Sequence, residues 1–232
     1  MARMARLYLA GCPQHLIQRG NNRMPCFHVE ADYQFYLEHL EKAAKRHGVA
    51  IHAYVLMTNH VHMLLTPADA SACAGMMQSL GRRYVRYFND RYSRTGTLWE
   101  GRYKSTLVDS DAYFFTVSRY IELNPVRAKI VQFPAGYYWS SYRINALGSP
   151  STLLTPHRLY VGLGSTEQTR QERYCRLFDH PIEPDLIAEL RQATNHAWVF
   201  GTEGFKEKIS AAVNRRTCSR GWGGNRRQWQ ER

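Results

Sequence analysis

Apolar residues follow two different periods along the first 145 residues of the chain. Short apolar runs of strand length alternate with longer segments in which apolar residues recur every three or four positions, as on one face of a helix. The strand-like runs are residues 15–19, 49–57, 61–66 and 104–109. The helical segments are residues 31–47, 69–92 and 111–124.

Turn-forming residues mark the ends of these segments. Gly20-Asn21-Asn22 closes the first strand, Gly48 ends the first helix, and Thr58-Asn59-His60 joins the second and third strands into an antiparallel pair. Pro125 ends or kinks the third helix after Asn124, because the residue before a proline is driven out of the α region. The order of elements predicts an α+β domain of residues 1–145, in which helices cover an antiparallel sheet.

The pattern changes after residue 145, and we treat residues 146–232 as a C-terminal extension. Residues 148–151, Gly-Ser-Pro-Ser, have the composition of a linker, and the periodicity of residues 174–190 and 204–213 predicts two short helices. Residues 215–232 hold six arginines and two tryptophans among glycines. Such a composition predicts a basic, flexible tail that becomes ordered when it meets a partner.

Charge narrows the choice of partner. The 232 residues include 31 Lys and Arg against 19 Asp and Glu, a formal net charge of +12, which favours a polyanion, with nucleic acid first and an anionic membrane surface second.

The rest of the composition indicates the class of protein. The hydrophobic share of 44% suits a packed core and argues against disorder. Neither a membrane-spanning run nor a signal peptide is evident, so we expect a cytoplasmic protein with no membrane contact. The five cysteines are scattered without a CxxC pair, which argues against a disulfide framework and a zinc knuckle.

The sharpest local feature is Asn59-His60-Val61-His62 in the third predicted strand. Because successive side chains of a strand point to opposite faces, His60 and His62 lie on one face and Val61 on the other. Two neighbouring imidazoles make half of a divalent-metal site. Two unrelated surface histidines produce the same pattern, so this motif alone does not decide.

Tyr120 and Asn124 are four residues apart and share one face of the third predicted helix. If that helix crosses the sheet over His60 and His62, the amide oxygen of Asn124 completes a three-ligand metal site and places Tyr120 beside the metal. A phosphodiester suits such a site, because a cation neutralises its oxygen and a tyrosine attacks its phosphorus. With 15 tyrosines in the chain, a plain packing role for Tyr120 is the competing interpretation.

Basic residues mark candidate DNA contacts. Arginines in the second helical segment alternate with tyrosines, which combines charge for phosphates with aromatic faces for unpaired bases, although the tyrosines fit a buried core equally well. Further cations extend this surface after residue 100, and the turn after the first strand offers arginine and amide groups suited to base edges. The candidate DNA-binding residues are Arg19, Asn21, Asn22, Arg82, Arg83, Arg86, Arg102 and Lys104.

Taken together, these motifs resemble the single-tyrosine HUH transposases, and specifically the REP-associated tyrosine transposases of bacteria. The similarity spans about residues 7–145. The segments that carry it are QRGNN (18–22), MTNHVH (57–62), GTLWEGRYK (96–104), RYIELNPVRA (119–128) and WSSY (139–142). Several motifs in the same order are far more specific than the histidine pair alone.

The resemblance implies a ferredoxin-like α+β fold that cleaves and rejoins single-stranded DNA at palindromic REP hairpins during transposition. Tyr120 would form a 5′-phosphotyrosine intermediate and leave a free 3′-hydroxyl, and His60, His62 and Asn124 would hold Mg²⁺ or Mn²⁺. Imidazole ligands favour Mn²⁺ at least as well as Mg²⁺. The expected partners are single-stranded DNA hairpins in the nucleoid, with the protein acting as a monomer or a homodimer.

Two other functions remain open from the residues. One is a hairpin DNA- or RNA-binding regulatory protein without catalysis. The other is a metal-dependent hydrolase in which the histidines activate water, Glu122 serves as general base and no covalent adduct forms.

Overall fold

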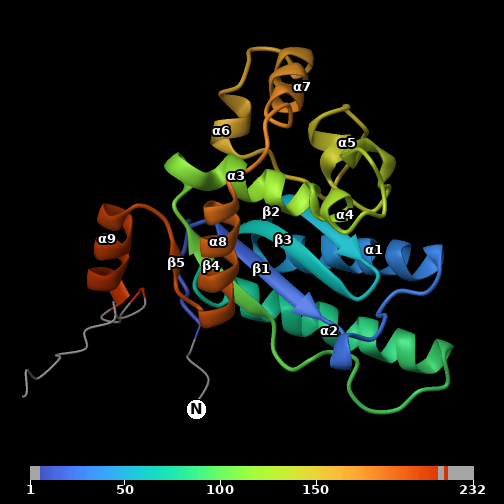
Figure 1. Ribbon diagram of the computed structural model, residues 1–232. Helices are drawn as coiled ribbons and strands as arrows, with labels where there is room; N and C mark the ends of the chain where they lie inside the picture. The colour runs from blue at the N-terminus through green and yellow to red at the C-terminus, as the bar shows by residue number, and fades with distance from the viewer. Residues whose placement is uncertain (1–5, 214–216, 219–232) are drawn as a thin grey trace, which may run out of the picture.

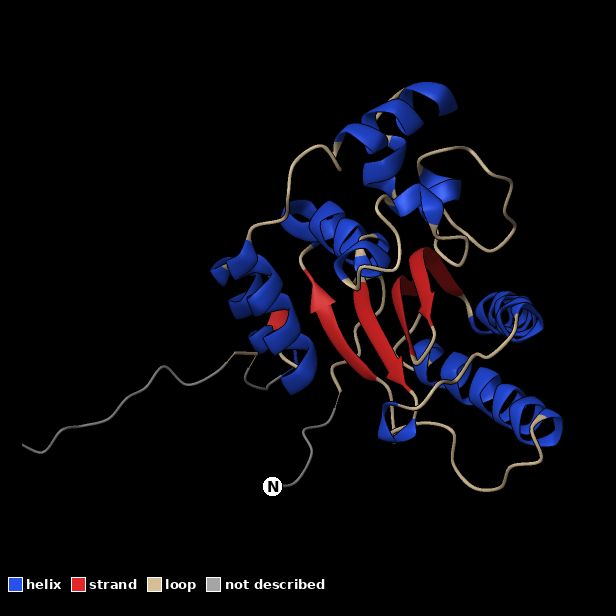
Figure 2. Cartoon of the chain, turned by 45° about the vertical axis from the view of Figure 1, so that its right-hand side comes forward, coloured by secondary structure: helices blue, strands red, loops and turns tan. Residues whose placement is uncertain are grey.

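Four strands follow the four predicted apolar runs. The computed structural model describes residues 6–213, 217 and 218, and its strands β1 (Gln14–Arg19), β2 (Val49–Met57), β3 (His60–Pro67) and β4 (Lys104–Val108) pair antiparallel. A short strand β5 (Val199–Phe200) adds to β4 in parallel, which gives the order β2-β3-β1-β4-β5. Figures 1 and 2 show helices on both faces of this sheet. The predicted α+β class with a helix-covered sheet is confirmed.

One face of the sheet packs against α1 (Glu30–His47) and α2 (Ala72–Arg91), whose bounds lie close to the predicted helices. Leu16, Val61 and Met63 are fully buried in this core. Each fully buried aliphatic side chain contributes about 1.5–3 kcal/mol. Since the strand period is two, burial of Val61 and Met63 here turns His60 and His62 to the opposite face.

The opposite face is covered by α3 (Ser110–Glu122) and α8 (Pro184–His196). The predicted helix 111–124 ends two residues early, at Glu122, and Asn124 begins the one-turn helix α4 (Asn124–Arg127). Pro125 lies in the first turn of α4, where a missing N–H costs nothing, so the chain restarts a helix instead of continuing one.

The C-terminal segment departs most from the prediction. The helix expected over residues 174–190 is wrong, because α7 (Glu167–Arg176) ends before Pro181 and α8 begins at Pro184. Proline cannot supply the amide that an uninterrupted helix needs there. The predicted second helix is confirmed as α9 (Glu203–Val213). The short elements η1 (Asn21–Arg23), η2 (Pro134–Gly136), α5 (Tyr142–Asn145) and α6 (Arg158–Val161) complete the described chain.

Residues 148–151 do not join two separate bodies, as a linker would. Just after them Leu154 forms a bridge with Ile51, and the amide of Thr155 donates to the carbonyl of Ile51 over 2.7 Å. Strand β5 and helix α8 then place the C-terminal segment on the sheet itself. The basic tail expected over 215–232 lies outside the described residues apart from Thr217 and Cys218. None of the helices described combines the length and the apolar character needed to cross a membrane.

Candidate active site

A cavity of about 450 Å³ opens on the face of the sheet that carries α3 and α8. Residues from β1, β3, β4, the α3–α4 junction and α8 line it. It contains all four residues of the candidate metal and nucleophile site together with three of the candidate DNA-binding residues, namely His60, His62, Tyr120, Asn124, Arg19, Arg102 and Lys104. Segments that are far apart in the sequence therefore meet at one place.

Each candidate histidine is oriented through one ring nitrogen. Nδ1 of His60 lies 2.6 Å from Oδ1 of Asn59, and Nδ1 of His62 lies 2.9 Å from Nε2 of His15. The rings of His60 and His62 are 5.0 Å apart, centre to centre. No hydrogen bond among the described residues uses Nε2 of either ring, so both Nε2 atoms are available to a ligand in the cavity.

Burial keeps these imidazoles neutral. It lowers the pKa of His60 to about 4, with Arg19 adding to the shift. Burial lowers the pKa of His62 well below its ordinary value, with smaller contributions from the neighbouring histidines and arginines, and it lowers the pKa of His15 to about 3. A neutral imidazole keeps a lone pair, which is the form that binds metal.

Tyr120 lies against these histidines at the end of α3. Its side chain is 5% exposed, and its ring centre is 5.8 Å from that of His62. The guanidinium of Arg127 stacks 4.2 Å from the ring centre and donates to the carbonyl of Tyr120 over 2.6 Å. Nε of Arg191, on α8, donates to the hydroxyl of Tyr120 over 3.4 Å. Arg127 thus holds the ring and Arg191 contacts the hydroxyl of a tyrosine that lines the cavity.

The donor set fits a divalent metal ion. Asn124 donates from Nδ2 to the carbonyl of Tyr120 over 3.3 Å, which leaves its Oδ1 as an acceptor without a partner among the described residues. His60, His62 and Asn124, which line the same cavity, thus offer two neutral imidazole nitrogens and one amide oxygen. Such a mixed set suits Mn²⁺ and, through its oxygen and water, Mg²⁺. No group of three or more His, Cys, Asp or Glu side chains placed to hold a metal occurs among the described residues, here or elsewhere, so the third ligand of this candidate set is the amide of Asn124.

The turn after β1 forms the rim of the cavity. Asn21 and Asn22 lie in η1, and Asn59 anchors the turn by donating to the carbonyl of Arg23 over 2.9 Å. Gly20 precedes the turn, and a Cβ at this position would lie 2.3 Å from the carbonyl oxygen of Met24, so only glycine fits. Of this group, Arg19 and Arg23 line the cavity, whereas Asn21 and Asn22 lie beside it.

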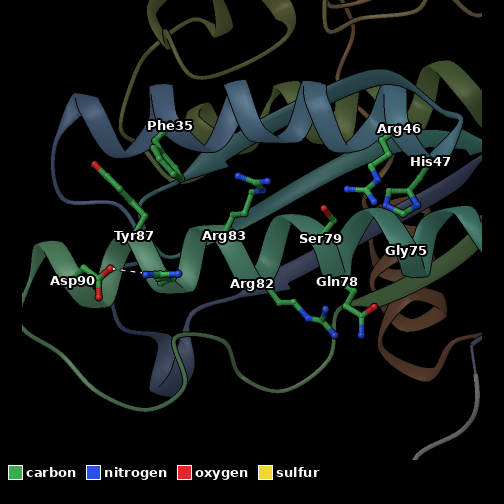
Figure 3. A pocket seen from close by; sticks show the side chains of 11 residues that line it. Phe35, Arg46, His47, Gly75, Gln78, Ser79, Arg82, Arg83, Tyr87 and Asp90 are labelled. Atoms are coloured by element: carbon green, nitrogen blue, oxygen red, sulfur yellow. Dashed lines mark ion pairs between the residues drawn. The ribbon is translucent and has the colours of Figure 1, made fainter.

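The arginines of α2 lie elsewhere. Arg82, Arg83 and Arg86 line a groove of about 710 Å³ between α1 and α2, on the opposite face of the sheet from the cavity. Figure 3 shows Arg83 and Arg46 pointing into the space between the two helices. The single surface expected to run from these arginines to Arg102 and Lys104 is therefore divided by the sheet, because α2 packs on the Val61 side.

Among the tyrosines of that helix, the packing interpretation holds for Tyr84. It is completely buried, and its hydroxyl donates to the carbonyl of Cys26 over 2.6 Å. Tyr87 stacks on Phe35 with ring centres 3.9 Å apart and donates to Asp32 over 3.0 Å.

The comparisons with known proteins agree with this architecture. The model of the family described as "Transposase IS200 like" matches residues 9–124, half of the chain, and includes the four candidate residues at the cavity. The chain belongs to this family. No curated protein matches it.

Two solved structures are similar to this IS200-like transposase. A REP-associated tyrosine transposase bound to a REP hairpin is 16% identical, with a TM-score of 0.52 over 68% of this chain and 93% of that one. A putative transposase from Deinococcus radiodurans R1 is 20% identical, with a TM-score of 0.36 over 52% of this chain and 96% of that one. The first likeness supports the HUH-type fold.

Sequence reasoning missed several residues of this transposase's cavity. His15 was also missed; it does not line the cavity but contacts His62, and its position on the same strand face as Ile17 and Arg19 was the available signal. Arg191 and Asn195 come from α8, outside the family match, and the incorrect helix boundary at 190 concealed them. Only the fold brings these α8 residues to the cavity.

Glu122, considered as a general base, points away from the cavity. It is completely buried and accepts hydrogen bonds from Ser141, Asn145 and Tyr174. Burial raises its pKa to about 7, against the smaller effect of those hydrogen bonds. Its place is in the packing between α3 and the segment that follows residue 140, which leaves the hydrolase hypothesis without its base.

Proposed function

We propose that this IS200-like transposase cleaves and rejoins single-stranded DNA at hairpins through a covalent bond between Tyr120 and a 5′-phosphate. The observation that carries the proposal is the convergence of Tyr120, His60, His62 and Asn124 on one cavity rimmed with cations. A REP hairpin is the ligand of the structural relative, which supports a hairpin substrate. We place this activity in the cytoplasm, at the nucleoid, in a monomer or a homodimer.

His60, His62 and Asn124 would hold the divalent ion, Mg²⁺ or Mn²⁺. When bound, such an ion neutralises a non-bridging phosphate oxygen and so favours in-line attack at phosphorus. The chain contributes neutral imidazoles, since burial keeps His60 and His62 unprotonated. Arg19 adds a fixed positive charge on the same cavity wall for the phosphate.

Tyr120 supplies the nucleophile. Its phenolic oxygen forms a bond to phosphorus as the phosphorus bond to the 3′-oxygen breaks; the phenolic proton leaves and the 3′-oxygen gains one, which gives a free 3′-hydroxyl. Arg191 donates to the phenolic oxygen over 3.4 Å and stabilises its negative charge during the exchange. Attack by the 3′-hydroxyl on the phosphotyrosine reverses the step and rejoins the strand without an external energy source.

In this proposal the two basic regions contact different parts of the DNA. Arg19, Arg102 and Lys104 hold the strand near the scissile phosphate. The turn residues Asn21 and Asn22 read base edges next to the cleavage site. The groove arginines Arg82, Arg83 and Arg86 contact phosphates of the hairpin stem on the far side of the sheet.

The direct test is an adduct assay on labelled single-stranded hairpin oligonucleotides from the host's repeats, with Mn²⁺ or Mg²⁺, on denaturing gels. The wild type is expected to form a protease-sensitive, metal-dependent adduct with the fragment 3′ of the cut, and Tyr120→Phe is expected to form none. Tyr138→Phe, at a tyrosine that is 63% exposed and outside the cavity, is the matched control.

Other outcomes separate the alternatives. Hairpin binding by the wild type without any adduct favours the non-catalytic regulatory protein. Cleavage that survives Tyr120→Phe favours the hydrolase, in which Tyr120 takes no part.

A further inference from the structure

Helix α8 reaches the candidate metal site through a chain of three buried side chains. Oγ1 of Thr194 donates to the carbonyl of Leu190 over 2.8 Å. Nδ1 of His15 lies 3.1 Å from the same Oγ1, and Nε2 of His15 lies 2.9 Å from Nδ1 of His62. His15, Thr194 and His62 are 0%, 1% and 3% exposed. The contact between His15 and Thr194 joins residues 179 positions apart.

The carbonyl of Leu190, at the end of this chain of hydrogen bonds, sets the direction of each of them. A carbonyl oxygen only accepts, so the single hydroxyl proton of Thr194 is committed to Leu190, and Thr194 accepts a proton from His15. His15 therefore carries its hydrogen on Nδ1. Because a completely buried imidazole is disfavoured as a cation, its Nε2 holds a lone pair.

That lone pair decides the tautomer of His62. Nε2 of His15 accepts from Nδ1 of His62, so His62 carries its hydrogen on Nδ1 and the lone pair on Nε2. The two ring planes lie within 8° of each other with centres 5.1 Å apart, which is the edge-to-edge arrangement of a hydrogen bond between two imidazoles and fixes the orientation of His62. His62 lines the cavity, and Nε2 is its only nitrogen not engaged by a described residue.

We propose that Thr194 and His15 are positioning residues that hold His62 in the tautomer and orientation needed to bind a divalent metal through Nε2. This inference rests on the proposed function, because it assigns His62 to the metal. It makes α8, which lies outside the segment matched by the family, part of the active site. His60 has an arrangement of the same kind, in which the partner, Asn59, is its neighbour in the chain.

The test compares Thr194→Val with Thr194→Ser in the full-length protein without DNA. Valine keeps the shape and removes the hydroxyl, whereas serine keeps the hydroxyl. We expect the Kd for Mn²⁺, measured by electron paramagnetic resonance titration, to rise about 10- to 100-fold in Thr194→Val, the usual cost of losing a group that orients a metal ligand. Thr194→Ser is expected to bind within about threefold of the wild type, because the hydroxyl remains.

A second measurement reads the tautomer itself. Long-range ¹H–¹⁵N spectra of the metal-free wild type are expected to show His62 with hydrogen on Nδ1, and this population is expected to fall in Thr194→Val. A His62 ring with hydrogen on Nε2 in the wild type overturns the inference, whether or not the variants fold.

The outcomes also separate this inference from the proposed function. Wild-type Mn²⁺ affinity in folded Thr194→Val overturns the role of Thr194 and leaves the metal site and Tyr120 chemistry intact. If the wild type binds no Mn²⁺, the metal site of the proposed function fails and this inference fails with it.

Discussion

Histidines and arginines line cavities on both faces of the sheet, and the histidines of the α3–α8 cavity are far more buried than the arginines of the α1–α2 groove. On the α3–α8 face, His60 and His62 are desolvated and neutral, and His62 is part of a buried chain that ends on α8. In the α1–α2 groove the arginine side chains stay in solvent, and that of Arg86 is 86% exposed beside Asp90 at 3.7 Å. The buried histidines are suited to hold a ligand in one geometry. The solvated arginines are suited to phosphate contacts that change position.

The largest expected effect is a difference in strand-cleavage rate between histidine variants on the two faces of the sheet. His60→Ala removes a proposed metal ligand and is expected to lower the strand-cleavage rate at least about 100-fold, since each tenfold corresponds to about 1.4 kcal/mol and a bound cation contributes several. His47→Ala, in the α1–α2 groove, is expected to stay within about twofold. Single-turnover cleavage at saturating hairpin measures both. Equal losses in the two variants would contradict the division of roles.

The next effect concerns Arg191. Arg191→Gln removes the charge beside the hydroxyl of Tyr120 and is expected to lower kcat about 10- to 100-fold with little change in KM. Gln192→Ala, at the neighbouring exposed position of α8, is the control. A raised KM with unchanged kcat would show that Arg191 only binds substrate.

The groove arginines are expected to change affinity without changing chemistry. Replacing Arg82, Arg83 and Arg86 with alanine should lower hairpin affinity about tenfold at physiological salt and reduce the slope of log affinity against log salt by up to about 2–3. Fluorescence anisotropy over a range of salt concentrations measures this. The control exchanges Lys42 and Lys45, which lie in exposed ion pairs of α1. An unchanged slope would remove the groove from the DNA path.

The smallest effect tests what holds the groove together. The carboxylate of Asp32 accepts hydrogen bonds from the amides of His28 and Val29 and from the hydroxyls of Tyr87 and Tyr92. Asp32→Asn is expected to lower the free energy of unfolding by about 1–3 kcal/mol, because it leaves donors without their acceptor. Mn²⁺ affinity is expected to stay unchanged, since the groove and the cavity are on opposite faces.

The lowered pKa of Asp32 predicts that the free energy of unfolding depends on pH. Burial raises the pKa of Asp32, but the hydrogen bonds outweigh it, so its pKa lies below the ordinary value of 3.8. The unfolded chain then binds the proton more readily, and the stability that Asp32 contributes is present above pH 3.8 and lost as the pH falls below it. Urea unfolding as a function of pH should show the wild type and Asp32→Asn converging in acid. A constant difference down to low pH would contradict this assignment.

Much of the fold and the central part of the site were accessible from the sequence. Strand period placed His60 and His62 on one face, and the burial of Val61 and Met63 fixed which face. Tyr120 and Asn124 meet as their spacing predicted, although the helix breaks at Leu123 and restarts. These relations hold because they are local and depend on backbone period alone.

Other relations required the tertiary structure. The side of the sheet on which α2 packs separates Arg82, Arg83 and Arg86 from the cavity, and a charge pattern holds no information about that choice. Strand β5 and helix α8 depend on contacts with β4 and His15, far away in the chain. The sequence by itself determined the strands, the histidine pair and the tyrosine with its asparagine. Only the tertiary structure decided that α8 reaches the candidate site, because the hydrogen bond from His15 to Thr194 forms between residues that no local period relates.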